Sequence, residues 1–442
     1  MTFKDLNLNT PLQNILEELG YIYPTPIQVK SLPIILSGRD IVGVAQTGTG
    51  KTFAYLLPIL KSLKYSEQRH PRVLIVVPTR ELVVQVVKEI EKLTKYITCR
   101  YAGIYGGTNI NTQKQLIYDG LDILVATPGR LLDLAIDKNL RLKSIQKLVI
   151  DEVDEMLNLG FRTQLINVLD LLPQKRQNLL FSATLTKDVN TIIQSYFNHP
   201  ETVEIAPTGT PLDLIIQKAY LVPNFYTKVN LLEHLLKDDS FTKVLIFVES
   251  KKLADRLAEH LEKSFGEQMG VIHSNKSQNF RLNAIKKFET GAHRILIATE
   301  LIARGIDIND VTHVINFDTP KIPENYIHRI GRTGRADKAG IAITFINEVE
   351  EAYQQAIESL MKIQIPLLDI PKNVEISTKF TDDERPNLMD KNYLKKSKLK
   401  GQGAFHTKKD KNKKQNIGGS YKLKIKAKYK KPQTRSAKSK KK

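Results

Sequence analysis

One cysteine, Cys99, is present in the 442-residue chain. A single thiol excludes an internal disulfide and any cysteine-rich zinc site, and it is typical of a protein that works in a reducing cytoplasm. We expect Cys99 to be a small core residue.

Long apolar runs are absent as well. No stretch approaches the roughly 20 residues that cross a bilayer, and the start lacks the basic and apolar regions of a signal peptide. We therefore expect a cytoplasmic location and no membrane partner. Hydrophobic content of 41% and charged content of 26% fit a globular protein, and the length allows two domains.

Excess positive charge is absent from most of the chain. Residues 391–442 carry 21 Lys and Arg against one acid, which leaves 46 basic and 46 acidic residues in 1–390. The net charge of +20 therefore belongs to this tail, and we expect the tail to be disordered in isolation. Aromatic and histidine side chains lie among its lysines: Tyr393, Phe405, His406, Tyr421 and Tyr429. This mixture favours non-specific nucleic-acid binding, and a merely solubilising tail is the alternative.

Short apolar runs alternate with longer helical stretches over residues 1–350, which is typical of α/β proteins with parallel sheets. In the first half, the predicted strands are Asp40–Val44, Val73–Val77, Ile123–Ala126, Lys147–Ile150 and Asn178–Phe181. In the second half, they are Val244–Val248, Gly270–His273, Arg294–Ala298, His313–Phe317 and Ile341–Ile346. Each half has enough strands for its own sheet. Residues 206–211 between them are small and rich in Pro and Gly, which predicts a linker.

A glycine-rich turn follows the first predicted strand. It reads Ala45-Gln46-Thr47-Gly48-Thr49-Gly50-Lys51-Thr52 and precedes a helical run. Such a turn aims backbone N–H groups and the positive end of a helix at one point, where phosphate binds. Lys51 can reach the β- and γ-phosphates, and the Thr52 hydroxyl can ligate Mg²⁺. Ala45 replaces the usual first glycine, and a flexible Gly/Thr turn is the alternative interpretation.

An acidic cluster ends another predicted strand. Asp151 and Glu152 follow the apolar run Lys147–Ile150. One carboxylate at this position can hold Mg²⁺, and the next can polarise an attacking water. A solvated turn is the alternative, but together with Lys51 the cluster indicates hydrolysis of ATP or GTP.

Polar clusters follow seven of the predicted strands, at the edge of the sheets where ligands bind in open α/β proteins. They are Gln46–Thr52, Pro78–Arg80, Thr127–Arg130, Asp151–Asp154, Ser182–Thr184, Glu249–Ser250 and Thr299–Glu300. This set predicts an extended site, larger than a nucleotide requires.

Taken together, these segments resemble the DEAD-box ATP-dependent RNA helicases, in particular their bacterial RhlE-like branch, over residues 1–365. The resemblance implies an α/β fold of two tandem RecA-like parallel-sheet domains with a disordered basic C-terminal tail. The implied boundaries are 1–205 for the N-terminal ATP-binding domain, 206–216 for the linker, 217–366 for the C-terminal helicase domain, and 367–442 for an extension whose Lys-rich tail begins at 391.

The resemblance also implies the cofactors, ATP and Mg²⁺, and their contacts. Gln28, in the segment Gly20–Gln28, is expected to read the adenine edge and so to select ATP. The implied nucleotide contacts are Phe3, Tyr21, Gln28, Ala45, Gln46, Thr47, Gly48, Thr49, Gly50, Lys51, Thr52 and Asp307. Thr52 and Asp151 are the implied metal residues. The implied catalytic residues are Lys51, Asp151, Glu152 as the base, and Arg332 and Arg335 as arginine fingers from the segment His328–Arg335.

RNA contacts and residues that couple RNA binding to hydrolysis follow from the same resemblance. The coupling set is Asp154, Ser182, Thr184 and His328. The RNA-binding set is Pro78, Thr79, Arg80, Gly106, Gly107, Thr127, Pro128, Gly129, Arg130, Ser250, Gln278, Arg281, Thr299 and Gly305. These groups suit phosphate and sugar, so recognition should not depend on base sequence.

Three residues depart from the family pattern. Val153 stands in place of alanine beside the metal site, Glu300 in place of aspartate, and Ser274 in place of glycine. None of the three removes a reacting group, but Glu300 lengthens a carboxylate arm near the RNA path and can alter coupling.

We therefore expect an RNA-dependent ATPase that locally unwinds RNA or remodels RNA–protein complexes. Its expected partners are single-stranded and short duplex RNA, with ribosomal or RNA-degradation assemblies as further candidates, and we expect a monomer. Two alternatives stay open: an ATP-gated RNA clamp that does not unwind, and a motor that acts on DNA.

Overall fold

The computed structural model describes residues 1–384 apart from 47, 138–139, 206–214, 301–310 and 335–338. It contains two seven-stranded sheets, in which the paired strands are parallel. The expected α/β class with two parallel sheets is confirmed. We call residues 1–205 the first lobe and 215–384 the second lobe and describe each by itself. The tail 391–442 and most of the expected linker lie outside the described residues.

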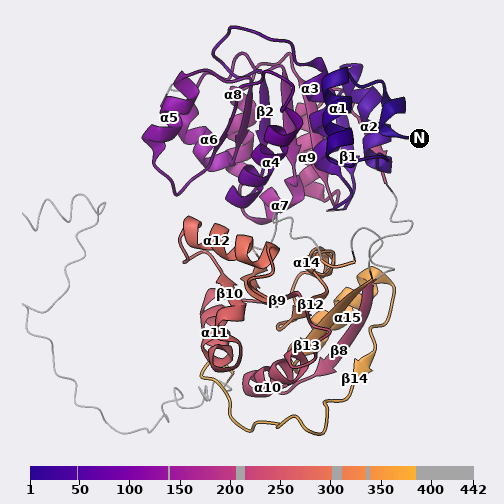
Figure 1. Cartoon of the computed structure of the whole chain (residues 1–442), viewed down its shortest axis with the longest axis vertical. Helices are drawn as coiled ribbons and strands as arrows, with labels where there is room; N and C mark the ends of the chain where they lie inside the picture. Colours follow the sequence, from indigo (N-terminus) through magenta and orange to yellow (C-terminus); the bar gives the residue numbers. More distant parts are fainter. Residues whose placement is uncertain (47, 138–139, 206–214, 301–310, 335–338, 385–442) are drawn as a thin grey trace, which may run out of the picture. The chain divides into compact units, whose positions relative to one another are not determined.

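The first lobe has helices on both faces of its sheet (Figure 1). The strand order is β3-β4-β2-β5-β6-β1-β7. The strands are β1 (Ile41–Val44), β2 (Val73–Val76), β3 (Tyr101–Ile104), β4 (Ile123–Ala126), β5 (Lys147–Asp151), β6 (Gln177–Ser182) and β7 (Glu201–Glu204). The helices are η1 (Phe3–Leu6), α1 (Thr10–Glu18), α2 (Pro26–Leu36), α3 (Lys51–Ser62), α4 (Arg80–Leu93), α5 (Ile110–Tyr118), α6 (Pro128–Ile136), α7 (Val153–Asn158), α8 (Arg162–Leu171) and α9 (Lys187–Tyr196).

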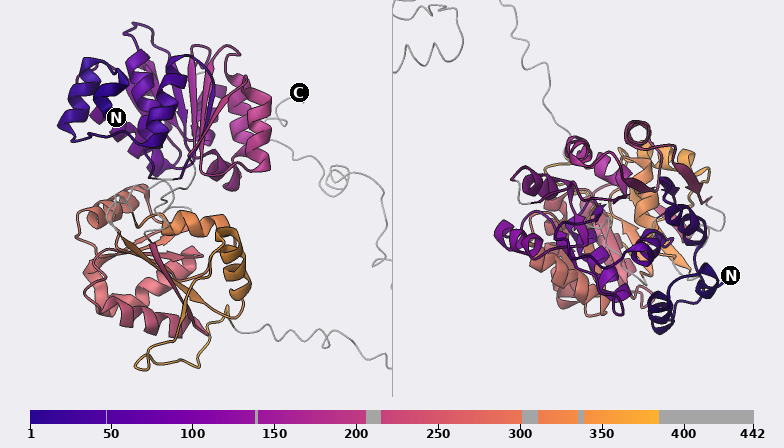
Figure 2. Two further views of the ribbon diagram at one scale, coloured as in Figure 1. Left: turned by 90° about the vertical axis from the view of Figure 1, so that its right-hand side faces the viewer. Right: turned by 90° about the horizontal axis from the view of Figure 1, so that it is seen from above.

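The second lobe repeats this architecture, and its sheet also lies between helices (Figure 2, left). The strand order is β10-β11-β9-β12-β13-β8-β14. The strands are β8 (Ile215–Leu221), β9 (Val244–Val248), β10 (Met269–Ile272), β11 (Ile295–Thr299), β12 (His313–Asn316), β13 (Gly340–Ile346) and β14 (Leu367–Leu368). The helices described are α10 (Phe225–Leu236), α11 (Lys251–Phe265), η2 (Gly266–Gln268), α12 (Gln278–Glu289), α14 (Pro323–Ile330) and α15 (Glu351–Met361).

All ten predicted strands are present, and none of their ends differs from the prediction by more than one residue. Four strands were missed: β3, β7, β8 and β14. Strand β8 begins at Ile215, inside the range 206–216 expected to be a linker, and β14 lies just past residue 366.

Side chains alternate along the strands, so the buried residues on the two faces of each sheet belong to different apolar clusters, two in the first lobe and three in the second. On β1, Ile41 faces one apolar cluster and Val42 faces the other. On β9, Val244 and Leu245 are separated in the same way. Because successive side chains point to opposite faces, strands buried on both sides must be apolar throughout. The half-buried Cys99 packs against the first cluster, and burial raises the pKa of its thiol to about 12, which fits a packing role.

Residues 370–384 form a strap along α10 and α11 in the second lobe. Val374 is buried in the lobe's main core. The Asn224 amide donates to the Ser377 carbonyl at 2.6 Å, and the Ser377 N–H donates to Thr227 Oγ1 at 3.0 Å. The strap thus belongs to the folded lobe.

A buried ion pair is found in the first lobe at the start of β2. Arg72 Nη2 lies 2.8 Å from Asp122 Oδ1, and both side chains are about nine-tenths buried. Burial acts to raise the pKa of Asp122, but Arg100 and Arg72 outweigh it and hold the pKa below its usual value.

No helix within the described ranges is long and apolar enough to cross a membrane.

Candidate active site

The phosphate loop forms the turn that the sequence predicts. Gly48 and Gly50 adopt φ of 83° and 86°, in the left-handed region that glycine tolerates best. Gly50 caps α3, which begins at Lys51. The Thr49 hydroxyl donates to the Gln46 carbonyl at 2.8 Å and braces the turn, while Thr47 lies outside the described residues. The N-terminus of α3 therefore opens toward the loop, as an anion site requires.

The predicted adenine-binding segment is tied directly to this loop. Gln28 Nε2 donates to the Gly50 carbonyl at 3.1 Å, and Gln28 Oε1 accepts from the Thr25 N–H at 3.0 Å. Tyr21, half-exposed, stacks edge-on against Phe53 with centroids 5.1 Å apart, and its neighbour Ile22 accepts from the Phe3 N–H. Gln28 is thus well placed beside the loop, and its reading of adenine stays a prediction.

Lys51 is the electrostatic centre of the site. Its side chain is 6% exposed. Within the part of the chain that the structure describes, its ammonium has no hydrogen-bond partner. A buried cation without a partner is costly. Polyphosphate is the ligand that a lysine following a glycine-rich loop would hold.

Asp151 lies at the end of β5, two strands away from β1 in the sheet. Burial raises the pKa of its carboxyl, and Lys51 opposes that shift. Among the described residues, no cluster of three or more His, Cys, Asp and Glu side chains could hold a metal. Mg²⁺ is commonly held through one or two carboxylates together with substrate phosphates, so Asp151 and Thr52 fit this ion.

Glu152 adopts a strained backbone conformation. Its φ is 52° and its ψ is 49°, and it caps α7 from the left-handed region. Such strain costs about 1–3 kcal/mol in a non-glycine residue and tends to occur at functional sites. Burial raises the pKa of Glu152, with Lys51 opposing. A raised pKa brings a carboxylate closer to the working range of a general base.

Tyr55 is a site residue that the sequence analysis missed. Its hydroxyl donates to Asp151 Oδ2 at 3.1 Å from a fully buried position on α3. Burial, followed by the charge of Asp151, raises the pKa of Tyr55, so the phenol stays neutral and fixes the carboxylate. Its position one helical turn after Lys51 was the only available signal, because residues i and i+4 share a helix face.

The predicted coupling residues of the first lobe are brought together. Asp154 Oδ2 accepts from the Thr184 N–H at 2.9 Å and from the Thr184 hydroxyl at 3.0 Å. The Ser182 hydroxyl donates to the Thr184 carbonyl at 2.7 Å. The acidic cluster at the end of β5 is thus hydrogen-bonded to the turn after β6. Val153, which precedes Asp154 in the sequence, is fully buried in the core.

The predicted RNA contacts of the first lobe gather at the ends of β2, β3 and β4. The Thr79 hydroxyl caps α4 by accepting from the Leu82 N–H at 3.2 Å. Gly107 has a φ of 82°, in the left-handed region that favours glycine, and a Cβ there would lie 2.1 Å from Arg80 Nη1. Arg130 Nη2 donates to the Thr108 carbonyl at 3.2 Å. Gly106 lies in the same turn, and Thr127, Pro128 and Gly129 begin α6.

In the second lobe, the predicted residues start helices or end strands. The Ser250 hydroxyl caps α11 by accepting from the Leu253 N–H at 3.2 Å, Gln278 begins α12, and Thr299 ends β11. Arg281 bonds to Gln278 within α12. His328 lies in the last turn of α14, and Arg332 follows that helix and is buried. Gly305, Asp307 and Arg335 lie outside the described residues.

Gly50 offers a direct test of the loop. A Cβ there would lie 2.4 Å from Gln28 Nε2 and would have to adopt the left-handed conformation. We predict that Gly50→Ala weakens nucleotide binding at least tenfold, measured by titration with a fluorescent nucleoside triphosphate. Gly38→Ala is the matched control, since Gly38 also has a positive φ, of 83°, but a Cβ there meets nothing within 4 Å. Equal affinity in the two variants would contradict the assigned role of the loop.

Comparisons with known proteins identify relatives of this chain. Residues 25–192 match the DEAD/DEAH box helicase family, and residues 227–337 match the helicase conserved C-terminal domain. The chain is 38% identical over 371 residues to DEAD-box ATP-dependent RNA helicase CshA of Bacillus subtilis, covering 84% of this chain and 74% of that protein.

Two solved structures have the same fold. Dbp5 of S. cerevisiae bound to RNA and ADP BeF3 has a TM-score of 0.76 at 30% identity, covering 84% of this chain and 96% of that chain. Mss116p bound to ssRNA and AMP-PNP has a TM-score of 0.74 at 29% identity, covering 84% of this chain and 78% of that chain. The chain therefore belongs to the DEAD-box family of ATP-dependent RNA helicases.

Proposed function

We propose that the chain couples ATP hydrolysis to the local, sequence-independent separation of short RNA duplexes. The observation that carries this proposal is the buried Lys51 ammonium at the phosphate loop, in the same site as the Asp151–Glu152 pair. ATP and single-stranded RNA together would favour a closed form, and hydrolysis with phosphate release would reopen it.

Each residue at the nucleotide site has a role that its position supports. Lys51 and Thr52 would bind phosphate, Asp151 would hold hydrated Mg²⁺, and Glu152 would orient and deprotonate the attacking water. Mg²⁺ supplies charge neutralisation at the phosphates. Arg332 and Arg335 of the second lobe would complete the site in the closed form, and such an arginine finger contributes about 10³–10⁵ in rate in related phosphoryl transfers.

The protein would recognise RNA through the sugar–phosphate backbone of the RNA. Arg80, Gly107 and Arg130 lie on one edge of the first sheet, and this mixture of guanidinium and open backbone suits phosphate and sugar. The relatives Dbp5 and Mss116p are bound to RNA and to ssRNA, which supports RNA as the ligand. Contact with 2′-hydroxyls is the feature that would separate RNA from DNA.

We also propose a family branch, a cellular location and partners for this protein. The relatives named CshA favour that branch over the RhlE-like branch expected from the sequence. A cytoplasmic location rests on the single cysteine. We infer a protein that works as a monomer. Ribosomal or RNA-degradation assemblies are the partners we propose, because the net charge of +20 in residues 391–442 favours RNA-rich surfaces.

Duplex displacement separates a helicase from an ATP-gated clamp. We predict that the wild-type protein releases one strand of a short RNA duplex when ATP is added, and that Glu152→Gln does not but forms a long-lived ATP-dependent complex with single-stranded RNA. RNA bound without strand release by the wild type would favour the clamp. Rapid dissociation of RNA from the variant would count against Glu152 as the base. Equal action on DNA duplexes would favour a DNA motor.

The tail can be tested by deletion. We predict that removing residues 391–442 raises the apparent dissociation constant for RNA about tenfold at low salt and flattens its salt dependence, because each phosphate contact to a single strand contributes a log–log slope of ~0.7. ATP turnover at saturating RNA should be retained. A tail of equal length made of Gly and Ser is the control for chain length. Unchanged RNA affinity at low salt would show that the tail only solubilises.

A further inference from the structure

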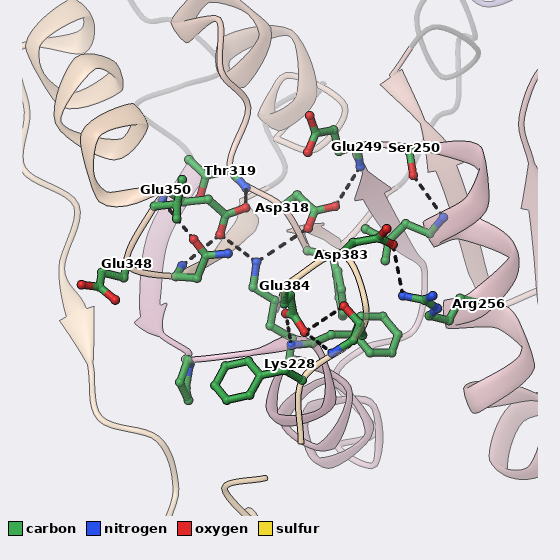
Figure 3. Close-up of a pocket in the computed structure, with 18 of the residues that line it drawn as sticks. Lys228, Glu249, Ser250, Arg256, Asp318, Thr319, Glu348, Glu350, Asp383 and Glu384 are labelled. Carbon is green, nitrogen blue, oxygen red and sulfur yellow. Dashed lines mark hydrogen bonds and ion pairs between the residues drawn. The ribbon is translucent and has the colours of Figure 1, made fainter. Parts of the chain in front are cut away.

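The two sheets have the same strand order, so each position in the first lobe has a counterpart in the second. Strands β1 and β8 are sixth in their sheets, β5 and β12 are fourth, and β6 and β13 are fifth. The nucleotide site of the first lobe lies after β1 and β5. Its counterpart in the second lobe therefore lies after β8 and β12, where a pocket of about 540 Å³ is found (Figure 3).

A buried lysine occupies this counterpart site. Lys228 lies on α10, the helix that follows β8, as Lys51 lies on the helix that follows β1. Unlike Lys51, Lys228 is fully paired: its Nζ lies 2.7 Å from Glu350 Oε2 and 3.7 Å from Asp318 Oδ1 (Figure 3). Asp318 lies just after β12, and its counterpart in the first lobe is Asp151 at the end of β5. The second lobe thus supplies its own anions to its lysine.

The backbone N–H groups at the start of α10 are also bonded to side chains of the chain itself. The connection from β8 is Val222-Pro223-Asn224, which contains no glycine to form a phosphate loop. Asn224 Oδ1 accepts from the Thr227 N–H at 3.0 Å, and Glu384 Oε1, from the strap, accepts from the Phe225 N–H at 2.6 Å. A carboxylate of the chain lies where a phosphate would bind in an open site.

The paired carboxylates hold one turn of backbone. Glu350 Oε1 accepts from the Thr319 N–H at 3.1 Å, and Asp318 Oδ2 accepts from the Glu249 N–H at 2.8 Å (Figure 3). Burial raises the pKa of Glu350, and Lys228 opposes that shift. A buried network in which each charge is paired fixes its members in one arrangement. The turn at 318–319 is therefore held from two sides.

This turn is bonded on its other side to Arg329. Arg329 Nη1 donates to the Asp318 carbonyl at 2.8 Å, and Nη2 donates to Glu300 Oε2 at 2.8 Å. The guanidinium also lies over the Phe247 ring, 5.2 Å from its centroid. Arg329 is 3% exposed, so its position is set by these contacts. Glu300 makes its contact through the longer arm that distinguishes this chain from the family pattern.

Arg332 lies three residues after Arg329, and its backbone N–H donates to the Arg329 carbonyl at 3.1 Å. We propose that Lys228 and Glu350 are positioning residues for ATP hydrolysis, acting through the 318–319 turn and Arg329 to fix Arg332. The proposal rests on the role of Arg332 as an arginine finger. A misplacement of about 1 Å far from the chemistry can lower a rate about 10²-fold, so the network need not touch ATP to matter.

Lys228→Met tests the proposal, because it removes the charge and keeps most of the volume. We predict that kcat for RNA-stimulated ATP hydrolysis falls about tenfold or more, while the dissociation constant for ATP stays within twofold. Lys228→Arg, which keeps the charge, should recover part of the rate. Arg72→Met is the matched control: it breaks another buried ion pair, in the first lobe, and should lower the melting temperature without lowering kcat. All rates are measured below the melting transition, and Glu350→Gln provides a second, milder variant.

A double-mutant cycle with Arg332→Ala separates the possible failures. If Lys228 acts through Arg332, the double variant should be no slower than Arg332→Ala alone, because residues acting as one unit are not additive. Additive losses would overturn the proposed route. Unchanged kcat in both Lys228→Met and Glu350→Gln would show that the network is only structural. Unchanged kcat in Arg332→Ala would overturn the finger assignment itself.

Discussion

A buried ammonium group that has no hydrogen-bond partner among the described residues is the constraint on which the first lobe depends. Lys51 is placed at the N-terminus of α3 by a turn with two glycines in the left-handed region. Taking such a charge out of water is unfavourable unless an anion compensates it. The raised pKa values of Asp151 and Glu152 show that burial, more than Lys51, governs these carboxyls as well. The site is thus arranged for a ligand that brings both phosphate and a cation.

The second lobe has the same topology, but its buried lysine is paired with carboxylates. Lys228 is neutralised by Glu350, and the start of α10 is capped by Asn224 and Glu384. In one copy the buried lysine has no hydrogen-bond partner among the described residues, and in the other it is paired with carboxylates of its own chain. The second copy has no glycine-rich loop at this position, and an ion-pair network takes its place. This division is consistent with one lobe binding ATP and the other presenting arginines.

Much of the fold and of the nucleotide site could be predicted from the sequence, because their signals are local. Buried parallel strands are continuous apolar runs, and the phosphate loop is defined by neighbouring residues. Strand β3 was missed because Gly103 and Tyr101 interrupt its apolar character, and β7 because its ends are glutamates. Tyr55 could not be assigned, since its partner Asp151 is 96 residues away in the chain. The Lys228 pairs and the strap likewise depend on contacts between distant segments.

Steady-state ATP hydrolysis with and without single-stranded RNA is the most direct test of the account as a whole. Purified protein and the variant Lys51→Ala would be compared over a range of RNA concentrations, with single-stranded DNA in parallel. We predict strong stimulation by RNA, little by DNA, and loss of activity in the variant. Hydrolysis that is indifferent to RNA, or stimulated only by DNA, would contradict it while leaving the nucleotide site intact.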